Sequence, residues 1–324
     1  MRNLLWKRGV WLIVLGWVSM WIIFPLWVGI YSVLWMFGWS MIALSAMVKL
    51  PLKWIAAMGA ALMFLHNLAD PITPVQFGHL AWLWTLLHVS GGIGPFPPHL
   101  LFGRIPINSF YSSYPLIPWM GVMAAGYAFG AVMKQPISSR RRALLWLGTA
   151  SIVLFILLRT TNVYGNPHAP DQFTCGDFHR QTTLANTVIA FLDTEKYPPS
   201  LQFLLMTLGP GFLALAALDN LRTGAQGLQS RIARFFLLYG RVPLFYYVLH
   251  VYLIHALAIV VSLVSRQPLD SLLRLNFSRP WTSYGHGLSF VYAMWIAVVL
   301  ILYLPCRWFM ELKRRRHNWW LQYI

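Results

Sequence analysis

One histidine lies where an ionisable side chain is costly. His250 stands about nine residues into an apolar stretch that begins near Arg241, so at about 1.5 Å per residue it lies near the middle of a bilayer. Tyr246 and Tyr247 precede it by one helical turn or slightly less, so the three side chains can share one face. The position favours His250 as a general base toward an amine or hydroxyl, with Tyr246 as a substrate contact. A neutral histidine hydrogen-bonded between helices is the alternative.

A second histidine stands close to a carboxylate. His66 and Asp70 are four residues apart at the end of an apolar stretch, so they can lie on the same helix face. A carboxylate beside an imidazole can fix its tautomer and raise its basicity, as in catalytic triads. We therefore treat both as catalytic candidates. The alternative is a histidine at a helix C-terminus, with Asp70 in a turn before Pro71.

A candidate phosphate-binding residue precedes the His250 stretch. Arg241 follows Gly240 and comes just before Pro243, at the expected start of a helix. A guanidinium binds phosphate with a fork of donors, and a helix start adds a positive dipole. Arg241 would therefore suit the phosphates of a nucleotide-like donor in the cytosol. A simple positive anchor is the alternative.

The remaining basic and histidine residues predict less chemistry. The runs at 140–142 and 313–316 are typical of anchors to acidic lipid. His255 is interpreted as a packing residue. Five further histidines lack the compact spacing of metal ligands, so no metal site is expected: His79, His88, His99, His168 and His179.

An aromatic mouth is expected at the start of residues 114–130. Tyr114 and Trp119 flank two prolines at the beginning of this apolar stretch, and such rings suit the depth where hydrocarbon meets headgroups. Proline fits the first turn of a helix. Gly126 and Gly130 share a face where another helix could approach closely. Tyr114 and Trp119 are therefore candidate substrate contacts.

The composition defines the class of protein. Of 324 residues, 58% are hydrophobic and 10% are charged, whereas soluble domains average about 25% charged. Such a chain predicts an all-α, polytopic membrane bundle in contact with the lipid bilayer. The net charge of +17 comes largely from basic residues in short loops, so it indicates topology and not nucleic-acid binding.

Eight spans and two long outer loops are predicted. With the N-terminus inside, most of the 25 Lys and Arg residues fall in inner loops, which places both termini in the cytoplasm. Cys175 and Cys306 then lie on opposite sides, so no disulfide is expected. The outer loops, 70–113 and 160–199, have the length of binding loops. The spans are 10–27, 30–48, 54–69, 114–133, 143–159, 200–218, 240–263 and 287–308.

Several stretches together resemble one family. They resemble the bacterial membrane proteins related to heparan-α-glucosaminide N-acetyltransferase, within the transmembrane acyltransferase group. The resemblance runs from near residue 7 to the C-terminus. The stretches are Gly38-Trp-Ser-Met-Ile-Ala-Leu44, His66-Asn-Leu-Ala-Asp70, Tyr114-Pro-Leu-Ile-Pro-Trp-Met-Gly-Val-Met123, Lys196-Tyr-Pro-Pro-Ser-Leu201, residues 239–255, and the region from Cys306 to Trp320.

The resemblance implies an activity. Such proteins take an acetyl group from cytosolic acetyl-CoA and pass it to a sugar or glycolipid on the other side of the bacterial inner membrane. Acetyl-CoA is then a co-substrate, and no metal is implied. Arg241 would face the donor, His250 the middle of the membrane, and the mouth formed by Tyr114 and Trp119 the sugar. The acceptor, the choice between amide and ester product, and the oligomeric state are left open.

The sequence also departs from the family pattern. Family members usually begin with two further spans that carry an Arg-Gly motif and an Asp-His pair, and this sequence starts after them. Residues 1–324 are therefore expected to form a single acyltransferase-like membrane domain without those spans. No proven catalytic residue is carried over. Two alternatives stay open: an inactive or repurposed scaffold, and a transporter or flippase in which His250 senses protons.

Overall fold

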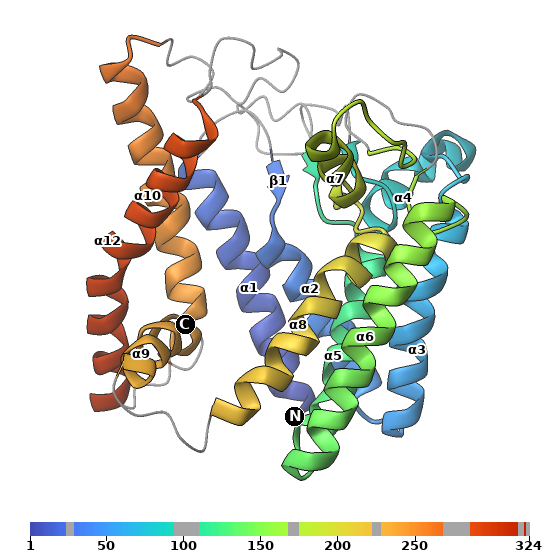
Figure 1. Cartoon of the computed structure of the whole chain (residues 1–324), viewed down its shortest axis with the longest axis horizontal. Helices are drawn as coiled ribbons and strands as arrows, with labels where there is room; N and C mark the ends of the chain where they lie inside the picture. Colours follow the sequence, from blue (N-terminus) through green and yellow to red (C-terminus); the bar gives the residue numbers. More distant parts are fainter. Residues whose placement is uncertain are drawn as a thin grey trace. The chain divides into compact units, whose positions relative to one another are not determined.

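The chain divides into two compact units. The computed structural model describes residues 1–23, 29–93, 110–167, 175–221, 228–267, 286–316 and 321 (Figure 1). The first unit comprises Met1–Trp17, Gly29–Leu101 and Asn108–Thr223. The second comprises Val18–Val28, Phe102–Ile107 and Gly224–Ile324.

The expected spans are helices. Six helical segments are long and apolar enough to cross a membrane, so the prediction of an all-α membrane bundle is confirmed. The helix α2 has 15 residues, fewer than the roughly 20 that a bilayer crossing needs. The helices at the eight expected spans, of which α1 and α2 are not among these six, are α1 (Arg2–Ile23), α2 (Val33–Met47), α3 (Leu52–Leu65), α5 (Leu116–Met133), α6 (Ile137–Thr161), α8 (Leu201–Leu221), α10 (Pro243–Val264) and α12 (Leu288–Arg315).

The two long loops carry regular structure of their own. The 3₁₀ helix η1 (His66–Ala69) directly precedes the first loop. This loop contains the 3₁₀ helix η2 (Pro74–Leu80), the helix α4 (Ala81–Leu87) and two strands, β2 (Gly91–Ile93) and β3 (Phe110–Ser112). The strand β1 (Gly29–Tyr31) pairs in parallel with β3, and β2 pairs antiparallel with it. The second loop contains α7 (Leu184–Leu192).

Close helix contacts in the first unit depend on glycine. A Cβ on Gly59 in α3 would lie 2.5 Å from the backbone nitrogen of Ala125 in α5, and one on Gly121 would lie 2.8 Å from Leu62. These two glycines allow α3 and α5 to pack backbone to backbone. The prediction of close approach at Gly126 and Gly130 is wrong, because a Cβ at either would meet no described atom within 4 Å.

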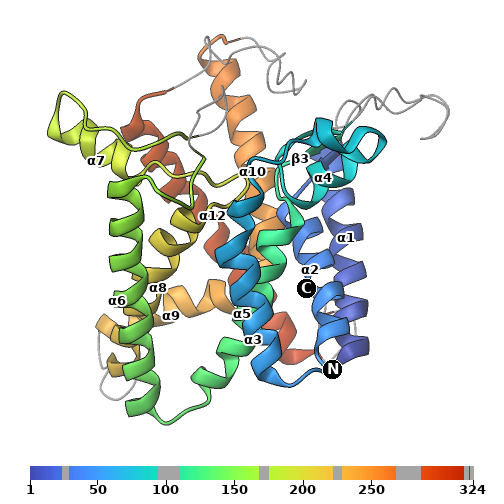
Figure 2. The same cartoon turned by 90° about the vertical axis from the view of Figure 1, so that its right-hand side faces the viewer.

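The ends of the first unit differ in chemistry. Figure 2 shows α4, β3 and α7 at one end, which we call the capped end, while the N-terminus and the turn between α5 and α6 lie at the other. Exposed lysines and arginines occupy that other end, which we call the basic end: Lys49, Lys53, Lys134, Arg141 and Arg142.

A buried ion pair joins α6 to α8 near the basic end. Arg140 Nε and Nη2 lie 2.7 and 2.9 Å from the two carboxylate oxygens of Asp219, and both residues are buried. Arg140 also donates to the Met133 carbonyl. The expectation that Arg140 anchors acidic lipid is wrong, because its guanidinium is occupied within the protein.

Breaking this pair is expected to destabilise the first unit. The variant Asp219→Ala leaves a buried guanidinium without its counter-charge, so its apparent melting temperature should fall by several degrees. The matched variant Arg141→Ala removes the exposed charge next to Arg140 and should change the melting temperature little. Size-exclusion chromatography after heating in detergent measures both. Equal melting temperatures for the two variants would contradict the expectation.

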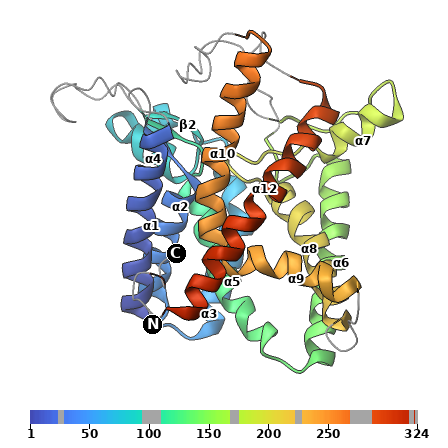
Figure 3. The ribbon, with the colours of Figure 1, turned by 90° about the vertical axis from the view of Figure 1, so that its left-hand side faces the viewer.

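The second unit is built around α10 and α12. Its core contains Val242, Val298, Leu302, Cys306 and Phe309. The ring of Phe245 stacks on Phe309 with centroids 4.1 Å apart. The helix α9 (Leu228–Arg241) lies across the direction of α10 and α12 (Figure 3) and packs through Phe235, which stacks on Tyr303 at 5.5 Å.

Candidate active site at the capped end

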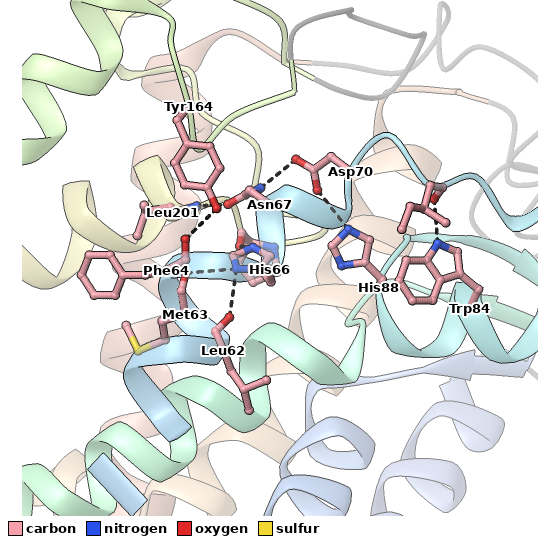
Figure 4. Close-up of polar contacts among 12 residues, drawn as sticks. Leu62, Met63, Phe64, His66, Asn67, Asp70, Trp84, His88, Tyr164 and Leu201 are labelled. Carbon is pink, nitrogen blue, oxygen red and sulfur yellow. Dashed lines mark hydrogen bonds and ion pairs between the residues drawn. The ribbon is translucent and has the colours of Figure 1, made fainter. Parts of the chain in front are cut away.

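The candidate site lies where α3 and α4 end. The helix α3 continues as η1, and the chain leaves it at Asp70, just before Pro71, which cannot extend a helix. His88 follows α4 and closes that helix, because its backbone N–H donates to the Trp84 carbonyl at 2.8 Å. The two helix ends thereby bring Asp70 and His88 together (Figure 4).

Asp70 and His88 form a carboxylate–imidazole dyad. His88 Nε2 lies 3.0 Å from Asp70 Oδ1, and the His88 side chain is 1% exposed. An ionised carboxylate only accepts hydrogen bonds, so Nε2 carries a proton and Nδ1 of the neutral ring has a free lone pair. Nδ1 is buried and has no hydrogen-bond partner among the described residues. The ring of Trp84 lies 5.0 Å from that of His88. The dyad is therefore an oriented base whose acceptor atom is not used by the described part of the protein.

The expected pairing of His66 with Asp70 is not what the structure shows. His66 Nδ1 lies 3.1 and 3.0 Å from the Leu62 and Met63 carbonyl oxygens, and Nε2 lies 3.0 Å from that of Pro199. A neutral imidazole has one N–H, and when Nε2 carries it His66 donates to the Pro199 carbonyl and holds residue 199 against α3. Asp70 turns instead to His88, 18 positions along the chain. The sequence offered no local signal for His88, because only the ends of two helices place it there.

Asn67 connects the dyad to the start of α8. Its Nδ2 donates to Asp70 Oδ2 at 2.9 Å, and its Oδ1 accepts from the backbone N–H of Leu201 at 2.9 Å. Both oxygens of Asp70 therefore accept a hydrogen bond. The Asn67 amide cannot flip without placing its NH₂ group against the Leu201 N–H, so its orientation is determined by two partners.

The segment before α8 is held by a buried carboxylate. Glu195 is buried, and its two oxygens accept from the backbone N–H groups of Cys175 at 2.9 Å and Tyr197 at 2.7 Å. The Ser90 hydroxyl donates to the Tyr197 carbonyl. These contacts position Tyr197 beside the segment that follows His88.

The two aromatic residues of the expected mouth lie close together, and Tyr197, which the sequence did not single out, lies against Tyr114. The hydroxyl oxygens of Tyr114 and Tyr197 lie 3.4 Å apart, and the two rings meet edge to face at 5.3 Å. The Tyr114 and Trp119 rings lie 6.0 Å apart. Trp119 Nε1 is buried with no hydrogen-bond partner among the described residues. This aromatic group therefore combines ring faces and two tyrosine hydroxyls with a buried N–H that no described residue accepts from.

A buried arginine holds the second loop in place. Arg159, in the last turn of α6, is 2% exposed and donates to the carbonyl oxygens of Ala190 at 2.8 Å, Phe191 at 3.1 Å and Asp193 at 2.6 Å, at the end of α7. It also donates to Gly176 at 3.2 Å. A cation at a helix C-terminus is favourable, so Arg159 caps α7.

Cys175 belongs to this loop and is not a nucleophile at neutral pH. Burial, together with the hydrogen bond from its Sγ to Asp193 at 3.1 Å, raises the pKa of Cys175 to about 12. The thiolate fraction at pH 7 is then about 10⁻⁵. Cys175 and Cys306 are both free.

The alkylation rate of Cys175 should follow this pKa. In a Cys306→Ala variant, the rate constant with iodoacetamide is expected to rise about tenfold per pH unit to beyond pH 10. An ordinary thiol, whose pKa is 9.0, would level off earlier. The thiol form stabilises the fold below pH 9.0, and this contribution is lost as the pH rises toward about 12. A plateau near pH 9 would show that the loop does not shield the thiol.

The second unit carries the other expected residues. His250 Nδ1 lies 2.5 Å from the Tyr247 carbonyl oxygen, and its ring stacks on Tyr246 at 5.4 Å. Nδ1 is thus the donor, and Nε2 is the acceptor of the neutral ring. Arg241 is exposed and ends α9; its Nη1 lies 4.0 Å from Met310 Sδ. These features are compatible with a base at His250, a substrate contact at Tyr246 and a phosphate contact at Arg241, whose roles stay predictions.

Within the described ranges, no group of three or more His, Cys, Asp or Glu residues could hold a metal ion. His99 and His168 lie outside those ranges. No protein-family model, curated protein or solved structure matches the chain.

Proposed function

We propose that the chain is a membrane acyltransferase that moves an acetyl or acyl group from cytosolic acyl-CoA to a sugar or glycolipid on the opposite side of a bacterial inner membrane. The observation that carries the proposal is the Asp70–His88 dyad. Its carboxylate orients a buried imidazole whose Nδ1 lone pair is unused by the described residues. A base of this kind serves reactions that must remove a proton from a hydroxyl or amine.

The proposed step balances without a further reagent. The acceptor oxygen or nitrogen attacks the thioester carbonyl carbon while His88 Nδ1 takes its proton. The carbon–sulfur bond then breaks, and CoA leaves as a thiolate that is protonated by the imidazolium or by water. The Asp70 carboxylate stabilises the imidazolium at 3.0 Å. His250 is the second candidate base.

The distribution of charge supports the proposed orientation. In the first unit most of the exposed lysines and arginines lie at the basic end, and such residues favour the cytoplasm. Arg180 and Lys196 are the exposed basic residues described in the loop at the capped end. The basic end, with the N-terminus, would then be cytoplasmic and the capped end periplasmic. In the second unit, Arg241 and the basic residues that close α12 would be on the cytoplasmic side with the C-terminus.

The aromatic mouth supports a sugar as acceptor. Tyr114, Tyr197 and Trp119 offer ring faces and polar atoms, which suit the apolar faces and hydroxyls of a sugar. Ser90 joins this group to the dyad, because it bonds to Tyr197 and lies two positions after His88. Tyr114, Tyr197 and Trp119 are thereby assigned to the acceptor, while Arg241 is assigned to the acyl donor.

Labelled acetyl-CoA tests the proposal. The full chain is reconstituted in vesicles containing a bacterial glycolipid extract and amino sugars, and radiolabelled acetyl-CoA is added on the basic side. Transfer of label to lipid or sugar, above that of empty vesicles, is the expected result. Absence of transfer and of CoA release would overturn the proposal and favour a scaffold or a transporter.

A further inference from the structure

We propose that α7 is a membrane-surface helix whose apolar face enters the lipid leaflet at the capped end, which is the outer leaflet in the orientation proposed above. The face consists of Leu184, Val188, Ile189 and Leu192, at positions i, i+4, i+5 and i+8 of one helix. All four are exposed, Leu184 at 81% and Ile189 at 67%. The sequence of α7 contains no charged residue.

The orientation of α7 on the protein is determined by the contacts of Phe191, at the edge of the apolar face, and by contacts at both helix ends. The Phe191 ring packs edge to face on Phe155 at 5.3 Å and on Phe178 at 5.2 Å. Arg159 holds the carbonyl oxygens at the helix C-terminus. The Thr183 side chain caps the N-terminus by accepting from the Asn186 N–H at 3.2 Å. The apolar face is thus turned away from the protein by contacts at both ends of the helix.

The position of α7 identifies what covers this face. Figures 2 and 3 show α7 projecting past the outer side of α6 at the capped end of the first unit. The helix α6 is a candidate membrane span, and its outer side chains Val153, Ile156 and Leu157 are exposed apolar residues on the same helix. Because α6 ends at Thr161, α7 lies just beyond the span, at the depth of the headgroups. An apolar face exposed at this depth would meet the same leaflet that surrounds the exposed apolar side chains of α6.

The helix α7 is connected to the loop at the candidate site. Arg159 and Asp193 connect α7 to the loop that holds Glu195 and Tyr197. A helix lying in the interface would keep this loop at headgroup depth, so the aromatic mouth would open toward the membrane surface and not toward bulk water.

Collision accessibility of spin labels tests the proposal without any assay of activity. The full chain carrying Cys175→Ser and Cys306→Ala receives one cysteine at a time, Ile189→Cys or the matched control Asn186→Cys on the exposed polar edge of the same helix. Val153→Cys provides a lipid-facing reference and Val188→Cys a second variant on the apolar face. The labelled protein is reconstituted in nanodiscs of phosphatidylcholine and phosphatidylglycerol.

The expected result is a severalfold higher ratio of oxygen to nickel-chelate accessibility at residues 188 and 189 than at residue 186, approaching that of residue 153. Equal nickel access at residues 186 and 189 would overturn the proposal, because α7 would then be in water. Protection from both reagents, with dipolar coupling between labels on different molecules, would also overturn it, because a second copy of the chain would cover the face.

Discussion

Replacing His88 by alanine is expected to lower acetyl transfer by a factor of about 10²–10⁴, the usual contribution of a positioned general base. The variant removes the Nδ1 lone pair that would accept the proton, while Asp70 and Asn67 keep their own hydrogen bond. Transfer of label from acetyl-CoA measures the rate. His79→Ala is the matched control, because His79 is an exposed histidine in η2, and it should leave the rate unchanged.

Asp70→Asn is expected to cause a loss of similar size for a different reason. Both Asp70 oxygens accept, one from His88 and one from Asn67, whereas an asparagine offers one acceptor and one donor. Asn67 cannot adjust by flipping, since its Oδ1 accepts from Leu201. If the new amide donates to His88 Nε2, the proton moves to Nδ1 and the base is lost.

Nitrogen-15 NMR of labelled histidine separates this effect from a folding defect. The wild-type His88 should show the Nε2-protonated tautomer, and Asp70→Asn should show the opposite one or a mixture. A wild-type rate in His88→Ala would remove His88 from the mechanism. If His250→Ala abolishes transfer in that case, the base lies in the second unit.

Replacing Arg159 by leucine is expected to open the loop that carries Tyr197. The side chain donates to four partly buried carbonyl oxygens, and hydrogen bonds from a charged donor contribute about 1.5–3 kcal/mol each, although not additively. We expect protection of amides 184–200 from hydrogen exchange to fall about 100-fold, which corresponds to about 2.7 kcal/mol.

The exchange pattern distinguishes a local from a global effect. Amides of α3 and α5 should keep their protection in Arg159→Leu, because Gly59 and Gly121 pack those helices independently of the loop. Arg141→Leu, an exposed position in the same helix, is the control. Uniform loss of protection throughout the first unit would show that Arg159 supports the whole unit and not the loop alone.

Local sequence was sufficient for the helices at the expected spans, whereas it did not predict α7 and α9. Apolar stretches of about 20 residues become helices in a membrane because each backbone group must bond within its own segment. Residues 80–88, which contain α4, have a 3.6-residue apolar period, which is likewise a local feature. Tyr114 and Trp119 lie together because they are within two turns of one helix start.

Pairings between distant residues were decided by tertiary structure alone. Asp70 is 18 positions from His88, Arg140 is 79 from Asp219, and Tyr197 is 83 from Tyr114. Helical period relates only residues three or four apart, so it favoured His66 as the partner of Asp70. Which side chains meet across helices depends on where α3, α4, α6 and α8 end and how closely they pack. That is why the sequence determined the membrane class and the helices of this protein, while the packing of those helices determined its candidate base.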